Sequence, residues 1–171
     1  DLDSRRDAFC GKISVCNNLY KYGIPFTDTT LHTYSIYDSL LKKDIDKFAA
    51  ICRVVNGLRH CRLGQIGTRP LGFNTCRASE KLLQHSGITV VPADLSEILY
   101  AAQKIQDDDP KFIEMCNRTC NYAKVPDSYK EKLGLQAKFS VAVENWIEAN
   151  DVQAVAIACW DSLEQNYGCA P

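Results

Sequence analysis

The sequence predicts an α/β fold: a three-layer sandwich around a parallel sheet of four strands or slightly more, flavodoxin-like or Rossmann-like. Short apolar runs alternate along the chain with segments in which apolar residues recur every three or four positions. This alternation is typical of strands connected by amphipathic helices, and it favours right-handed crossovers in a parallel sheet. Glycine separates a helical segment from an apolar run at Gly23 and again at Gly87, as αβ connections commonly require.

Four segments are expected to form strands. The first, 24–26, contains Pro25, which favours a strand start or a sheet edge. The second, 62–67, runs into a glycine-rich loop, and the third occupies 88–91. The fourth, 152–159, is a nearly continuous run of small apolar residues, which is typical of a strand buried on both faces.

Helices are expected around these strands. The apolar positions of the first begin at Phe9 and stop before Gly23, where a helix-ending glycine belongs. The next helix, 37–55, is expected to end at Asn56 and Gly57. Asp94, followed three residues later by Glu97, forms a variant of the capping box and predicts a helix that begins directly after it. The remaining helices are expected at 78–85, 112–122, 129–149 and from residue 160 onward.

The chain length of 171 residues fits one α/β domain, with a helical insertion near 110–150. The chain begins at Asp1 and stops at Gly168-Cys-Ala-Pro171 without a polar tail, so we expect a domain cut from a longer chain. The net charge of −1, with both signs intermixed, favours neither nucleic acid nor an anionic membrane as a partner. No apolar run approaches the roughly 20 residues that span a bilayer.

Nine cysteines, an odd number, cannot all pair within one chain. Four of them, Cys16, Cys52, Cys76 and Cys120, lie in segments expected to be helical, where free thiols serve as small buried hydrophobes. Because no CxxC motif occurs, a structural zinc site is not expected. The predicted state is buried, reduced thiols in a cytoplasmic protein.

The loop after the second strand is the first candidate for function. Ligands of open α/β sheets bind at the carboxyl ends of the strands, where this loop is expected to lie. The glycines at 64 and 67 match neither a dinucleotide fingerprint nor a phosphate-binding loop, so they indicate close packing and a tight turn. Thr68 and Arg69 follow them. Arg69 could bind an oxyanion or sugar hydroxyls, or form a structural salt bridge, and Phe73 could line a pocket or pack inward.

The loop after the fourth strand is the second candidate. It carries Cys159, Trp160 and Asp161, and it is expected at the same edge of the sheet as Thr68 and Arg69. An aromatic ring beside a carboxylate suits a sugar, although Trp160 could equally cap the core and Asp161 a helix. Cys159 has no histidine nearby in the sequence to activate it as a nucleophile. His32, His60 and His85 are scattered, and no catalytic or metal-binding role is expected for them.

In order along the chain, several segments resemble the L-fucose isomerase and L-arabinose isomerase superfamily, in particular its fucose-isomerase-like proteins. The resemblance is to a middle α/β domain. The segments are Phe9-Cys-Gly11, Gly23-Ile-Pro-Phe26, 62–70 with Phe73 and Glu80, Gly87-Ile-Thr-Val90, Asp94-Leu-Ser-Glu97, 156–160, and Tyr167-Gly168.

This resemblance implies an aldose–ketose isomerase in which a divalent ion, usually Mn²⁺, holds two substrate oxygens while carboxylates move a proton between C1 and C2. The family's metal ligands lie beyond the Cys159–Trp160 segment, and no residue here matches them. The fragment is therefore expected to contribute substrate-binding pocket walls and oligomer contacts without a catalytic or metal-binding residue of its own. The parent chain is expected to form a homo-oligomer.

Two alternatives remain open at this stage. The chain could be a non-catalytic flavodoxin-like module that binds a sugar or a phosphate. It could also be an isomerase relative that has lost its chemistry and serves as a scaffold. The sequence identifies neither the sugar nor the metal.

Overall fold

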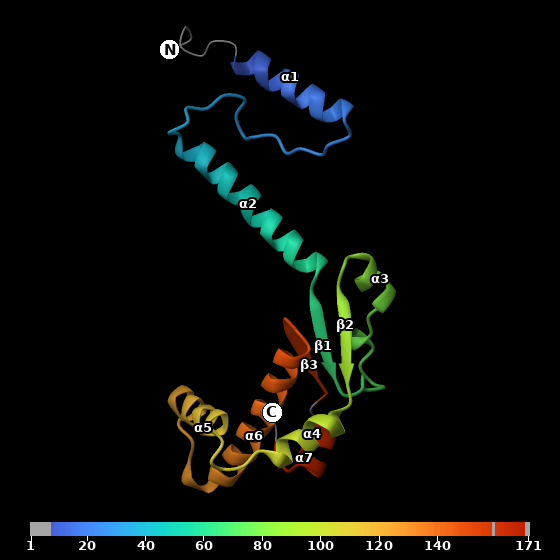
Figure 1. Ribbon diagram of the computed structural model, residues 1–171, viewed down its shortest axis with the longest axis vertical. Coiled ribbons are helices and arrows are strands. Elements are labelled where there is room, and N and C mark those ends of the chain that lie inside the picture. Colours follow the sequence, from blue (N-terminus) through green and yellow to red (C-terminus); the bar gives the residue numbers. More distant parts are fainter. Residues whose placement is uncertain (1–7, 159, 170–171) are drawn as a thin grey trace. The chain divides into compact units, whose positions relative to one another are not determined.

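The computed structural model describes residues 8–158 and 160–169, and of Trp160 the backbone alone. Cys159 and the side chain of Trp160 lie outside the described part. The chain forms two compact units, Asp1–Asn56 and Gly57–Pro171 (Figure 1).

The first unit contains the helices α1 (Ala8–Lys21) and α2 (Ser39–Arg59), and the unit boundary falls in the last turn of α2. The predicted end of α1 is confirmed: Gly23 has φ 66°, and its amide donates to the carbonyl of Tyr20. The predicted end of α2 is wrong, because the helix continues through Gly57 to Arg59. Glycine inside a helix costs only about 1 kcal/mol, which the rest of a long helix offsets.

The segment 24–26 is a loop, so the predicted first strand is wrong. A strand needs a partner for its backbone N–H and C=O groups. Within the described part of this unit the other elements are helices. The side chains of Ile24 and Phe26 are half exposed, at 50% and 45%, so burial does not favour an extended strand there either.

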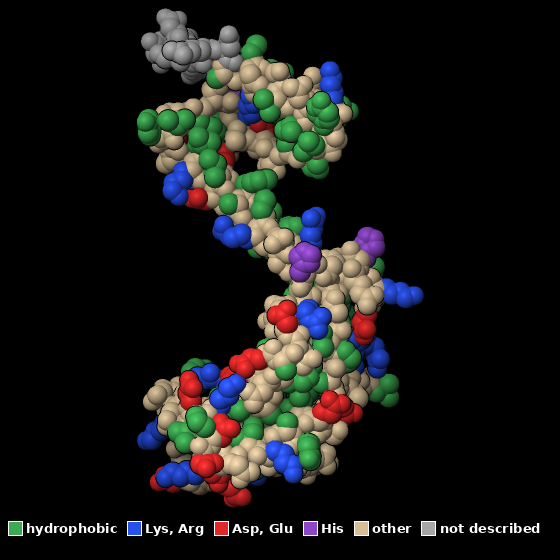
Figure 2. Space-filling model, viewed as in Figure 1, with side chains coloured by type: hydrophobic (Ala, Val, Ile, Leu, Met, Phe, Trp, Pro, Cys, Tyr) green, Lys and Arg blue, Asp and Glu red, His purple; other side chains and the backbone are tan. Residues whose placement is uncertain are grey.

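Neither α1 nor α2 has a buried residue. Large apolar side chains along both helices, among them Phe9 and Phe48, are about half exposed. Figure 2 shows hydrophobic side chains on the surface of both helices. Hydrophobic burial within the described part of this unit is therefore limited. Polar contacts make the larger contribution to holding its elements together.

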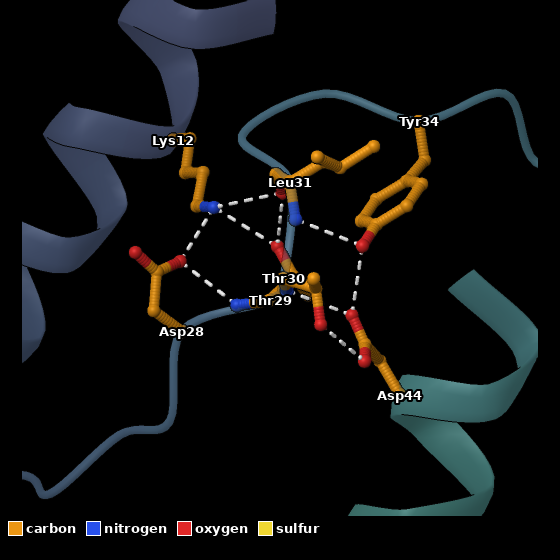
Figure 3. Close-up of polar contacts among 7 residues, drawn as sticks. All are labelled: Lys12, Asp28, Thr29, Thr30, Leu31, Tyr34 and Asp44. Atoms are coloured by element: carbon orange, nitrogen blue, oxygen red, sulfur yellow. Dashed lines mark hydrogen bonds and ion pairs between the residues drawn. The ribbon is translucent and has the colours of Figure 1, made fainter. Parts of the chain in front are cut away.

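A polar network joins α1 and α2 through the loop between them (Figure 3). From α1, Lys12 forms an ion pair with Asp28 at 2.5 Å and donates to the hydroxyl of Thr29 at 2.9 Å. From α2, the carboxylate of Asp44 accepts hydrogen bonds from the amide and the hydroxyl of Thr30, both at 2.8 Å, and from the hydroxyl of Tyr34 at 2.9 Å. The loop is thus fixed to both helices by charge-assisted hydrogen bonds.

The second unit contains a parallel sheet of three strands in the order β2-β1-β3 (Figure 1). The strands are β1 (Arg62–Ile66), β2 (Thr89–Ala93) and β3 (Ala154–Ile157). The α/β class and the parallel pairing are confirmed, whereas the described residues form three strands in place of the four expected. The flavodoxin-like or Rossmann-like assignment stays a prediction.

The strand buried most deeply is β1, not β3. Gly64 and Ile66 of β1 are buried, whereas exposed and half-buried residues alternate along β3. The prediction that the last strand is buried on both faces is therefore wrong. β3 pairs with β1 alone among the described strands, and Val155 and Ile157 pack on the core while Ala154 and Ala156 are exposed.

The helices that follow are α3 (Glu80–His85), α4 (Leu95–Lys104), α5 (Pro110–Tyr122), α6 (Lys130–Ala149) and α7 (Trp160–Asn166). Short 3-10 turns occupy Asn74–Cys76 and Asp127–Tyr129. The predicted cap of α4 is confirmed, since the carboxylate of Asp94 accepts a hydrogen bond from the amide of Ser96 at 2.8 Å. The helical stretch expected near 110–150 is present as α5 and α6.

The main core lies between one face of the sheet and α4, α6 and α7. Ile66, Ile98, Phe139 and Leu163 come from these four elements and are at most 2% exposed. Gly64 permits this packing as predicted: a β-carbon built there would lie 2.7 Å from the ring of Trp146 on α6.

All eight described cysteines are free thiols, and among these eight only Cys169 is buried. The predicted burial is wrong for Cys52, Cys76 and Cys120, which are exposed. Within the described residues, no helix has the length and apolar character needed to cross a membrane.

Replacing Asp44 with alanine is expected to release the loop from α2. The three bonds from Thr30 and Tyr34 lower the pKa of Asp44 below its ordinary value of 3.8. Because the folded-state pKa is lowered, the contacts persist as the pH falls to that ordinary value and are lost only below it. NMR should show a Thr30 amide with slow hydrogen exchange in the wild-type protein, and faster exchange in Asp44→Ala at neutral pH. Asp46→Ala, which removes an exposed pair with Lys42 on the same helix, should leave that amide unchanged.

Replacing Gly87 with alanine is expected to destabilise the second unit by at least about 2 kcal/mol. Gly87 has φ 86°, and an added β-carbon would lie 2.2 Å from the carbonyl oxygen of Arg59. Urea unfolding followed by tryptophan fluorescence measures the change. Gly134→Ala is the matched control: no atom lies within 4 Å of its added β-carbon. That variant should gain roughly 0.5–1 kcal/mol, because glycine is unfavourable within a helix. Equal stabilities of the two variants would contradict the packing described.

Candidate functional site

The loops after β1 and β3 emerge side by side from one edge of the sheet. The two strands pair in parallel, with Ile66 opposite Ile157. Directly after them, the amide of Ala158 donates to the carbonyl of Ile66 at 2.9 Å. A β-carbon built on Gly67, whose φ is 81°, would lie 3.0 Å from the β-carbon of Ala158. The predicted proximity of the two loops and the predicted tight turn at Gly67 are both confirmed.

These two loops leave the sheet toward opposite faces. After β1, the chain crosses the face to which Gln65 points, because Arg69 donates hydrogen bonds both to the side chain of Gln65 and to the carbonyl of Ala78. After β3, the chain enters α7, whose Leu163 packs with Ile66 on the other face. Two adjacent parallel strands with diverging connections form a topological switch point, the usual place for a ligand in an open α/β sheet.

A cleft of about 360 Å³ lies at this switch point. Its volume falls at the lower end of the range of about 300–1,000 Å³ that ligand pockets occupy. The first loop contributes Thr68, Pro70, Phe73 and Cys76, and β3 with its loop contributes Ile157, Ala158, Asp161 and Ser162. A neighbouring hollow of about 530 Å³ shares Thr68, Ala158 and Ser162 with it and extends to Asp94.

Arg69 holds the first loop against the sheet. Its Nε and Nη2 donate to Oε1 of Gln65 at 3.0 and 2.7 Å, and Nη2 also forms an ion pair with Glu80 at 2.9 Å. Its Nη1 donates to the carbonyl of Ala78 at 3.4 Å. Gln65 in turn donates to the carbonyl of Gly67 at 3.2 Å. The structural salt bridge that the sequence left open is therefore present, and contact of Arg69 with a substrate stays a prediction.

The other predicted site residues divide into two groups. Thr68, Phe73 and Asp161 all line the cleft, and Phe73 is 40% exposed there. The backbone of Trp160 begins α7, so Asp161 is the second residue of that helix and not the residue before it. The side chain of Trp160 lies outside the described residues, and its predicted contact with a sugar stays untested.

Sequence reasoning missed two residues that shape this site. Gln65 was not predicted, because a single polar residue within a strand forms no recognisable sequence motif. Its position two residues before Gly67, on the face opposite Ile66, was the available signal. Ser162 lines both hollows and was passed over as part of a helix start.

The described residues around the cleft offer hydroxyl and carboxylate oxygens. The pKa of Asp94 is lowered by the hydrogen bonds from Ser96, so this carboxylate is ionised at neutral pH. No group of three or more His, Cys, Asp or Glu in the described part of the chain is arranged to hold a metal ion. These residues therefore do not fit a metal centre, and they can bind a polar molecule through hydrogen bonds.

Comparison with known proteins agrees with the motifs. Residues 1–59 match the family model described as the N-terminal domain of fucose/sulfoquinovose isomerase, whereas the motifs alone indicate a middle domain. Sulfoquinovose isomerases of Priestia aryabhattai and Priestia megaterium are each 25% identical to this chain over 122 residues. That segment is 71% of this chain and 27% of each relative, so the chain spans about a quarter of the length of the curated relatives it matches. These matches confirm the resemblance of the chain to the fucose-isomerase-like superfamily.

Proposed function

We propose that this chain is a domain of an aldose–ketose isomerase of the L-fucose/L-arabinose isomerase type. Its part is to form one wall of the substrate pocket. Thr68, Phe73 and Asp161 contact the sugar, Trp160 stacks on it, and Arg69 fixes the loop that carries Thr68. The observation that carries the proposal is the cleft at the switch point between β1 and β3, which is lined by hydroxyl, carboxylate and aromatic groups.

The remaining catalytic parts belong to the complete protein. A divalent metal such as Mn²⁺ would hold the two substrate oxygens during proton transfer between C1 and C2. Its ligands are not among the residues described here. Self-association of the complete protein is part of this proposal, because the superfamily resemblance implies oligomers.

The complete protein, supplied with Mn²⁺ and a panel of aldoses, is expected to form ketose. Asp161→Ala and Thr68→Ala should raise KM, each by about 10-fold, the effect of losing one hydrogen bond of roughly 1.5 kcal/mol to a substrate. Lys132→Ala is the control, because Lys132 lines a separate hollow of about 580 Å³ beside α5 and α6. Absence of ketose with every sugar, or equal effects of all three variants, would contradict the proposal.

A non-catalytic sugar- or phosphate-binding module is the second candidate, since the cleft by itself is compatible with binding alone. The two candidates differ in the affinity of the 171-residue chain. One wall of a pocket should bind a sugar only weakly, with Kd on the order of 1 mM or above, whereas a dedicated module should reach the micromolar range. Calorimetry on this chain distinguishes these outcomes.

A further inference from the structure

We propose that the free side of β3 is an interaction surface for a further parallel strand, which the complete protein supplies from the segment directly after α7. This surface is separate from the cleft, and its role does not depend on the isomerase activity. Among the described strands, β3 pairs with β1 alone, so the other side of β3 has no strand beside it.

Two residues of β3 direct their backbone N–H and C=O groups to this free side. The amide of Gln153, directly before β3, donates to the carbonyl of Arg62 on β1 at 3.0 Å. Because successive residues of a strand direct their backbone groups to alternate sides, the groups of Ala154 and Ala156 face away from β1. Such a row of backbone groups is a template on which another strand can pair.

The two outer strands of the sheet differ on their free sides. On β2, the amide of Thr89 donates to the carbonyl of Cys61, so the same alternation places Pro92 on the free side of β2. Proline has no N–H to donate, which is typical of a strand at the end of a sheet. β3 is Ala-Val-Ala-Ile and contains neither a proline nor a charged residue that would protect an edge. The sheet therefore ends at β2 and can extend at β3.

The path of the chain identifies the strand that extends it. From β1 to β2 the connection crosses the face of Gln65, and from β2 to β3 it passes through α4 and α6 on the opposite face, where the core lies. These two connections run in opposite directions across the sheet on opposite faces, so they have the same hand.

The same rule applies to the connection after β3. α7 and Cys169 pack on the core, so the chain leaves β3 on the face that carries α4 and α6. Parallel crossovers are right-handed in about 98% of cases. A connection on this face with the same hand continues in the direction from β2 to β3 and reaches the free side of β3. The strand after α7 is therefore the occupant that the topology selects.

The complete protein has the length to supply this strand, since the chain spans about a quarter of the length of the curated relatives it matches. A second copy is the competing occupant, but pairing of β3 with β3 across a two-fold axis would be antiparallel. A parallel strand beside β3 would end at the same edge of the sheet as β1 and β3. It would extend the rim on which Asp161 and the cleft lie.

Hydrogen exchange of the complete protein, resolved to single amides by mass spectrometry, tests the pairing. The amides of Ala154 and Ala156 should exchange at least about 100-fold more slowly than in an unstructured peptide, as amides of paired strands do. The amide of Ala158, which bonds to Ile66, is the protected reference, and the amide of Val90 on the free side of β2 is the unprotected one. Rapid exchange at Ala154 and Ala156 beside a protected Ala158, or equal protection of Val90 and Ala156, would overturn the proposal.

The same data test which segment pairs with β3. We expect a protected run of about five amides, the length of an ordinary strand, in the segment directly after α7. Protection of Ala154 and Ala156 without such a run would overturn the assignment of the occupant. Protection that is lost as the protein dissociates on dilution, with dissociation followed by native mass spectrometry, would replace that occupant with a second copy.

A pair of variants at residue 156 separates strand pairing from simple covering of the edge. Ala156→Pro removes the N–H on the free side, which an edge strand tolerates and a paired strand does not. It should abolish the protection of the Ala154 amide in the complete protein, whereas Ala156→Gly, which keeps the N–H, should retain it. Equal protection of Ala154 in both variants would contradict the pairing. If Ala156→Pro does not fold, exchange in the wild-type protein decides the proposal.

Discussion

The parallel pairing of β1 with a strand on each side is the constraint on which the second unit depends. β2 and β3 lie on opposite sides of β1, and the connections after β1 and β3 leave toward opposite faces of the sheet. The same pairing buries Gly64 and Ile66 against α4, α6 and α7 and brings Gly67 next to Ala158. The cleft is therefore a consequence of strand order, and its chemistry is set by the few side chains that two loops carry.

Local patterns predicted the elements of both units well where the deciding information lies within a few residues. Asp94 and the residues directly after it contain the capping signals that begin a helix. Gly23 and Gly67 adopt the left-handed conformations that their positions require. The predictions were wrong where the structure of a segment depends on which strands lie beside it. The run 152–159 has the composition of a central strand, yet β3 pairs with β1 alone among the described strands. The segment 24–26 has apolar residues suited to a strand, but among residues 8–56 its unit contains no partner strand.

In the candidate site, too, some features could be predicted from the sequence and others could not. The approach of the two loops followed from the rule that parallel strands end at one edge, and the structure confirms it. The environment of Arg69 could not be predicted, because its partners Gln65 and Glu80 are brought together only when the loop folds back on the sheet.

The cleft depends on the contact between the loops after β1 and β3. The most direct measurement is the nuclear Overhauser effect between the α-protons of Gly67 and the methyl group of Ala158 in the assigned, folded chain. A strong effect is expected, since a β-carbon on Gly67 would lie 3.0 Å from that methyl carbon. Absence of this effect, together with absence of protection of the Ala158 amide that bonds to Ile66, would contradict the pairing and with it the cleft.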